Sequence, residues 1–135
     1  MIPETTLAAW APRMLSVLRI ITALLFLQHG LTKFFGFPGP SPANFQALSL
    51  IGLAGAIEIV GPLLLAAGLF TRLAAFIMSG EMAFAYFIGH APASFYPLVN
   101  RGEGAILFCF IFLYIAIAGG GPWGIDGARS IQPRE

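Results

Sequence analysis

Two carboxylates stand inside segments that are otherwise almost wholly apolar. Glu58 lies in the middle of LAGAIEIVGPLLL (53–65), and Glu81 lies in the next apolar segment. An ionised carboxylate is costly to bury, in a protein core or in a bilayer, unless a partner or a proton neutralises it. Both residues are therefore candidates for a proton or ligand site, and their chemistry depends on which groups can reach them.

The preceding apolar segment offers partners for these carboxylates. Its polar and aromatic residues recur every three or four positions and so share one face of a helix; they are Arg19, Thr22, Phe26, His29 and Lys33. We expect this face to point into a helical bundle, with Arg19 either reaching Glu58 or Glu81 or extending to the interface. His29 and Lys33 form an i, i+4 pair near the opposite end of the helix.

Composition places these segments in a lipid bilayer. Of 135 residues, 58% are hydrophobic and 10% are charged, whereas soluble domains carry about 25% charged residues. The net charge of +1 and the scattered basic residues exclude a nucleic-acid partner. Cys109 is the single cysteine, and the two histidines lie in separate segments, so we predict no metal site and no dithiol chemistry within one chain.

Four apolar segments approach the length of about 20 residues that crosses a bilayer. The predicted spans are 14–35, 48–70, 73–89 and 104–118, followed by a tail at 119–135. A loop rich in Pro and Gly at 36–47 joins the first two spans, and small residues would let the helices approach closely. We predict an all-α, integral membrane, four-helix antiparallel bundle with a single domain over 1–135, kinked at Pro62.

The distribution of basic residues predicts the orientation. Five arginines fall toward one face of the membrane, whereas Lys33 and Arg101 fall toward the other; the five are Arg13, Arg19, Arg72, Arg129 and Arg134. Cytoplasmic loops carry the excess of Lys and Arg. We therefore expect both termini and the tail in the cytoplasm and the loop at 36–47 outside it.

Some of these residues have structural explanations. Glu58, Glu81 and Arg19 are alternatively members of a structural ion pair that orients the bundle. In NRGE, Asn100 is positioned to cap the fourth helix while Glu103 reaches back to it as a capping box.

The ordered set of motifs resembles the DoxX family of small bacterial membrane proteins. The resemblance covers roughly residues 15–126, and the departure at Gly124-Ile125-Asp126 weakens only its end. It runs through Arg19, HGLTK (29–33), GAIEIVGPLLLAAGLFTR (55–72), MAFAYF (82–87) with His90, NRGEGA (100–105) and GGGPWGID (119–126). The charged and histidine positions that match are Arg19, His29, Lys33, Glu58, Arg72, His90, Glu103 and Asp126.

The resemblance implies a bacterial inner-membrane protein linked to redox homeostasis. The related DoxD subunit belongs to a thiosulfate:quinone oxidoreductase, and mycobacterial relatives are associated with superoxide dismutase and a sulfurtransferase. We therefore expect the membrane subunit of an oxidoreductase complex that holds a quinone or a similar molecule in an intramembrane polar cavity. The candidate catalytic residues are Glu58, Arg19 and His29, and the candidate cofactor-binding residues are Lys33, Glu81, Arg72, His90 and Glu103.

Two other functions fit the same residues. In the first, the chain is a non-enzymatic membrane scaffold whose buried charges fix the fold and whose loops recruit a soluble redox or sulfur-metabolism enzyme. In the second, the chain is a small-molecule transporter, and because four spans are few for one transport unit it would act as a homo-oligomer.

Overall fold

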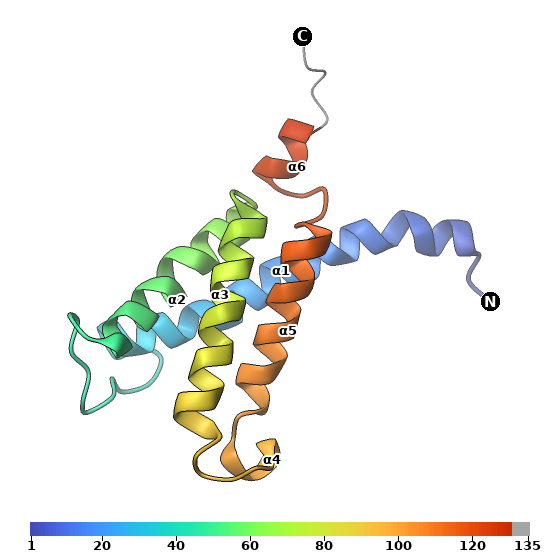
Figure 1. Cartoon of the computed structure of the whole chain (residues 1–135). Coiled ribbons are helices and arrows are strands. Elements are labelled where there is room, and N and C mark those ends of the chain that lie inside the picture. Colours follow the sequence, from blue (N-terminus) through green and yellow to red (C-terminus); the bar gives the residue numbers. More distant parts are fainter. Residues whose placement is uncertain (131–135) are drawn as a thin grey trace.

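The computed structural model describes residues 1–130, which form helices and no strand (Figure 1). The chain order is α1 (Glu4–Phe35), α2 (Leu50–Ala67), α3 (Thr71–Ala85), the π-helix η1 (Tyr86–His90), α4 (Pro97–Asn100), α5 (Glu103–Ala118) and α6 (Ile125–Ser130). The prediction of an all-α antiparallel bundle of four main helices is confirmed.

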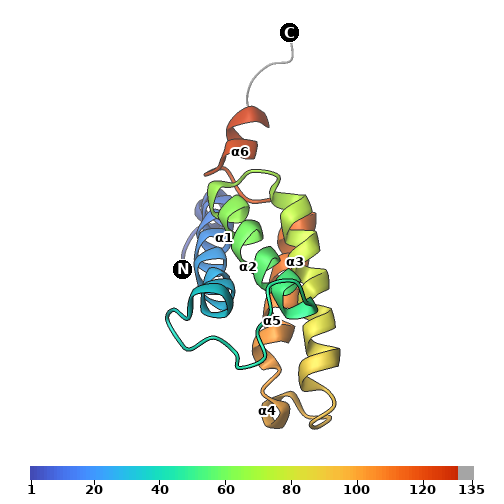
Figure 2. The same ribbon diagram turned by 90° about the vertical axis from the view of Figure 1, so that its left-hand side faces the viewer.

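The bundle is built from two helix pairs, which meet where α2 lies beside α3. α1 packs against α2, α3 packs against α5, and the tight turn at 68–70 places α2 beside α3. Figure 2 shows α6 beyond this turn at one end of the bundle and α4 at the opposite end. These two ends, called the α6 end and the α4 end below, hold different sets of polar residues.

Three helical segments are long and apolar enough to cross a membrane: α1, α2 and the continuous run from Thr71 to His90. α5 is shorter, and its 16 residues span about 24 Å at the rise of an α-helix, against about 30 Å for the hydrocarbon core. The helices bury only part of their apolar surface inside the chain, and side chains such as Leu53, Phe76 and Ile117 face outward. The chain is therefore a multi-pass membrane protein.

Helix α1 begins at Glu4, earlier than the span predicted from residue 14. Residues 4–14 are all exposed, and this part of α1 projects beyond the other helices (Figure 1). The Arg13 guanidinium lies over the Trp10 ring, 5.3 Å from its centroid. The other ends also differ from the predicted spans, since α2 begins two residues later than predicted and ends at a left-handed Gly68.

Local chemistry explains both ends of α2. The Ser49 hydroxyl accepts a hydrogen bond from the Gly52 N–H at 3.2 Å, which caps the first turn. At the other end Gly68 has φ 67° and its N–H bonds to the Leu64 and Leu65 carbonyls, which is the usual glycine stop. Pro62 is fully buried, and α2 continues through it as one helix.

Candidate functional site

A close approach of two backbones creates the site inside the bundle. A Cβ atom at Gly30 of α1 would lie 2.8 Å from the Gly55 carbonyl oxygen and 2.8 Å from the Glu58 carbonyl carbon of α2. Such separations are shorter than van der Waals contact, so only glycine fits at this crossing. The crossing brings the last turns of α1 against the middle of α2.

Lys33 and Glu58 form an ion pair across this crossing, between Nζ and Oε2. The Glu58 side chain is 4% exposed and the Lys33 side chain 20% exposed, so the pair is largely shielded from solvent and its attraction is stronger than that of a surface pair. In the part of the chain that the structure describes, this is the one ion pair.

Glu81 extends this cluster from α3. It lies close enough for the charges of Glu58 and Lys33 to act on it. Both of its carboxylate oxygens are buried, and among residues 1–130 neither has a hydrogen-bond partner. An ionised carboxylate without donors is costly in a low-dielectric environment. Glu81 therefore requires a proton or a donor from outside the described residues.

His29 borders the same region on α1, one turn before Lys33. It is exposed, and its ring packs edge-on against Phe108 with 5.8 Å between centroids. The ring also lies 5.9 Å from that of Phe26, which is fully buried. His29 is thus exposed at the edge of the packing between α1 and α5.

His90 and Glu103 lie at the α4 end, apart from this cluster. His90 Nδ1 is 3.0 Å from the Asn100 carbonyl oxygen. The Asn100 side chain donates to the Ser94 carbonyl at 2.8 Å and accepts from the Gly102 N–H at 2.7 Å. The predicted capping box is wrong, because Gly102 is the N-cap of α5 and Glu103 is its exposed first residue. Asn100 instead stabilises the loop before α5 through its hydrogen bonds to Ser94 and Gly102.

Arg19 lies at the α6 end and forms an ion pair with neither carboxylate. Of the two alternatives predicted for Arg19, the contact with Glu58 or Glu81 is therefore wrong. Fourteen residues separate Arg19 from Lys33, which is about 21 Å along a helix. The Arg19 side chain is 1% exposed, and its Nη2 donates to the Trp123 carbonyl in the segment that follows α5. The backbone N–H of Trp123 also donates to the Ser16 hydroxyl at 3.1 Å.

Three glycines form the slot that accepts the Arg19 guanidinium. A Cβ atom would lie 2.2 Å from Nη1 if added at Gly68, 2.4 Å if added at Gly124 and 3.0 Å if added at Gly120. Each of these positions is too close for a side chain, so Gly68, Gly120 and Gly124 leave the space that the guanidinium occupies. They let the chain after α5 fold back over the buried cation.

Asp126 attaches the same segment to the start of α3 by hydrogen bonds. Its carboxylate accepts from the Thr71 N–H at 2.8 Å and the Phe70 N–H at 3.3 Å, and its own N–H donates to the Gly68 carbonyl at 2.8 Å. Partial burial raises the pKa of Asp126, but these backbone donors outweigh it and hold the pKa below its ordinary value of 3.8.

Arg72 closes the end of α5 on the other side of this region. Its Nη1 donates to the Ala116 carbonyl at 3.1 Å and also to the Ile117 carbonyl. These are among the last carbonyls of the helix, which have no partner within it. Arg72 therefore acts as a C-terminal cap contributed by a neighbouring helix.

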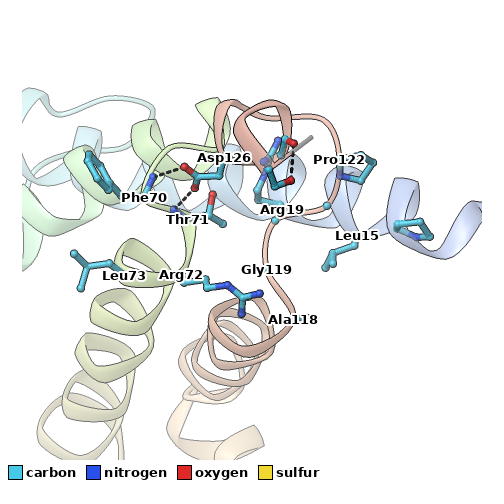
Figure 3. A pocket seen from close by; sticks show the side chains of 15 residues that line it. Leu15, Arg19, Phe70, Thr71, Arg72, Leu73, Ala118, Gly119, Pro122 and Asp126 are labelled. Carbon is cyan, nitrogen blue, oxygen red and sulfur yellow. Dashed lines mark hydrogen bonds between the residues drawn. The ribbon is translucent and has the colours of Figure 1, made fainter. Parts of the chain in front are cut away.

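A cavity of about 780 Å³ opens among these residues, lined by Arg19, Thr71, Arg72, Asp126 and the glycines at 119–121 (Figure 3). It lies at the α6 end, whereas the predicted polar cavity was to surround the intramembrane carboxylates. The predicted site residues thus divide into three groups: Lys33, Glu58 and Glu81 with His29 beside them, Arg19 and Arg72 at the α6 end, and His90 and Glu103 at the α4 end.

Sequence reasoning missed the residues that hold the α6 end together. Ser16 and Trp123 carry no chemical signature, and a backbone carbonyl acceptor has none at all. The one available signal was the density of glycines at 119–124, which is higher than ending a helix requires.

Comparisons with known proteins address the family directly. The family model described as DoxX matches residues 14–91, which contain the Lys33, Glu58 and Glu81 cluster. A protein of Haemophilus influenzae described as uncharacterized is 43% identical over 125 residues, covering 89% of this chain and 93% of that protein. No solved structure matches the chain. On the family match and this relative, the chain belongs to the DoxX family.

Proposed function

We propose that this DoxX protein is the membrane subunit of a redox-linked complex and that it binds the head of a quinone-type molecule at the Lys33, Glu58 and Glu81 cluster. The observation that carries the proposal is the buried Glu81 carboxylate, which lacks a hydrogen-bond partner among the described residues. Ionisable groups inside a membrane are costly and usually mark a functional site. A soluble redox or sulfur-metabolism enzyme would complete the complex at the bacterial inner membrane.

The residues of the cluster fit a quinone head. A protonated Glu81 can donate to a quinone carbonyl, and an ionised Glu81 can accept from a quinol hydroxyl. The Lys33 ammonium supplies a second donor beside it. A bound quinone would supply two-electron, two-proton redox chemistry. The chain itself would hold the head in place and take up or release a proton at the Glu81 carboxylate, while the electrons pass to or from the soluble partner.

Glu58 serves this site indirectly. Because its carboxylate is already paired with Lys33, we assign the proton to Glu81 and the orientation of the Lys33 ammonium to Glu58. His29 stands at the lipid-facing edge of the cluster, where a lipid-soluble molecule would enter from the side.

Quinone binding in lipid nanodiscs tests the proposal. The wild-type protein is reconstituted with ubiquinone or menaquinone, and bound quinone is counted by native mass spectrometry. Replacing Glu81→Leu removes the hydrogen bond to the head, and we expect about tenfold weaker binding or more. The matched control is Glu103→Gln, which changes an exposed carboxylate outside the cluster and should bind as the wild type does.

Glu81→Gln separates binding from proton transfer. The amide still hydrogen-bonds a quinone head but cannot exchange a proton. We therefore expect the quinone to be retained and its reduction to the quinol, which takes up two protons, to become slower. No stoichiometric quinone in the wild-type protein, or equal binding in Glu81→Leu and wild type, would overturn the proposed function.

A further inference from the structure

The loop at 91–102, which contains α4, exposes apolar side chains at the end of the bundle. Phe95 is 86% exposed and Leu98 is 75% exposed, and the side chains of Tyr96 and Val99 are exposed beside them in the sequence. These residues are called the α4 surface below. Connections between helices are usually polar, and exposed apolar surface of this kind marks contact with another protein or with a membrane.

The same loop satisfies most of its own backbone N–H groups. Pro92 and Pro97 have no N–H. The Asn100 side chain donates to the Ser94 carbonyl and accepts from the Gly102 N–H. Further N–H groups bond to acceptors within the loop or in η1; they belong to Ala91, Ala93, Tyr96, Val99, Asn100 and Arg101. Because hydrocarbon offers no hydrogen bonds, a segment that meets lipid must satisfy its backbone in this way.

The length of α5 places the loop close to the boundary of the hydrocarbon core. α5 spans about 24 Å of a core that is about 30 Å thick, which leaves about 6 Å to be filled. At the α6 end, Arg72 bonds to the Ala116 and Ile117 carbonyls, and a charged side chain favours the polar side of the boundary. The missing length therefore falls at the α4 end, where the chain before α5 is the loop.

The helical run that leads into the loop is apolar on its exterior up to the last turn. Phe84, Phe87 and Ile88 are exposed, and they belong to the run from Thr71 to His90, which is long and apolar enough to cross a membrane. α4 lies directly beyond the ends of α3 and α5 (Figure 2). The lipid-facing exterior of a membrane-spanning segment thus reaches the start of the loop.

We propose that the loop at 91–102 lies in the membrane interface rather than in water, with the α4 surface against the acyl chains of the adjoining lipids. Aromatic side chains such as those of Phe95 and Tyr96 are typical of this level. The exposed side chain of Arg101 would extend from the end of α4 to the lipid headgroups. This contact is separate from the Glu81 cluster and does not depend on the function proposed for it.

Spin labels measure whether the loop meets lipid. The full chain carries Cys109→Ala and one new cysteine, Val99→Cys in α4, and is reconstituted in phosphatidylcholine bilayers. Accessibility of the label to oxygen, which concentrates in hydrocarbon, is compared with accessibility to a nickel chelate, which stays in water. The matched controls are Phe76→Cys on the exposed face of α3 and Asn44→Cys in the loop at 36–47, both at exposed positions.

We expect the Val99→Cys label to resemble the Phe76→Cys label, with about tenfold lower accessibility to the chelate than the Asn44→Cys label, because a polar complex is excluded from hydrocarbon. Equal chelate accessibility of the Val99→Cys and Asn44→Cys labels would place the loop in water and overturn the inference. Protection of the Val99→Cys label from both reagents would show that a second copy of the chain covers the α4 surface, which would also overturn it.

A second measurement decides the question should the Cys109→Ala background fail to fold. Phe95→Trp adds tryptophan fluorescence to the otherwise unchanged chain, and brominated phosphatidylcholine quenches indoles that contact acyl chains. We expect the added fluorescence to be quenched. Added fluorescence that is as strong in brominated as in ordinary bilayers would contradict the inference.

Discussion

Replacing Gly30→Ala should separate α1 from α2. The added Cβ would meet the Gly55 carbonyl oxygen and the Glu58 carbonyl carbon at 2.8 Å, and ordinary contact begins at 3.4 Å, so the helices must move apart by about 0.6 Å. Both obstructing atoms belong to the backbone and cannot rotate away. Overpacking of this kind costs about 1–3 kcal/mol, and the displacement also stretches the Lys33–Glu58 pair.

Gly80→Ala in α3 is the matched control, because Gly80 is exposed and a Cβ there would meet nothing within 4 Å. Alanine favours a helix interior over glycine by up to about 1 kcal/mol, so this variant should be as stable as wild type or slightly more stable. The free energy of unfolding is measured in mixed micelles by titration with a denaturing detergent. Equal stability of Gly30→Ala and Gly80→Ala would refute the close crossing of α1 and α2.

Two further predictions concern charges whose partners are known. Lys33→Met leaves Glu58 buried without its cation and should lower the free energy of unfolding by about 3 kcal/mol. The double variant Lys33→Met/Glu58→Leu removes both charges and should return to within about 1 kcal/mol of wild type. An equal loss of stability in the single and double variants would contradict this. The Asp126 carboxylate, with its pKa lowered by the Thr71 and Phe70 N–H groups, should stabilise the fold fully above pH 3.8 and lose that contribution as the pH falls through the lower folded pKa. Acid unfolding of wild type and Asp126→Asn should converge at low pH, and a constant difference between them would contradict it.

The helices could be predicted because the length of an apolar segment is a local property of the sequence. Apolar segments separated by Gly and Pro locate α2, α3 and α5 to within a few residues, since a membrane demands continuous apolar length. The start of α1 was not predictable in this way. Residues 4–14 form a helix that continues past the bundle, and hydropathy marks where a chain enters lipid rather than where a helix begins.

The pairing of the buried charges was harder to predict because it depends on helix crossing. The shared helix face of Arg19, His29 and Lys33 made all three candidate partners of Glu58. The glycine contact at Gly30 and Gly55 instead brings Lys33, close to the end of α1, against the middle of α2. Small residues in the second and third predicted spans indicated a close approach of helices, but which residues meet across α1 and α2 is a property of the folded pair.

The hydrogen bond from Arg19 to Trp123 also constrains the order in which the protein can be completed. The two residues are 104 positions apart, so a ribosome adding about 5–20 residues per second reaches Trp123 roughly 5–20 s after Arg19. Until then Arg19 lacks its carbonyl acceptor, and of the three glycines around its guanidinium Gly120 and Gly124 come from the same late part of the chain. A nascent chain stopped before residue 119 would lack these contacts, so the segment that follows α5 completes the packing around a residue of the first helix.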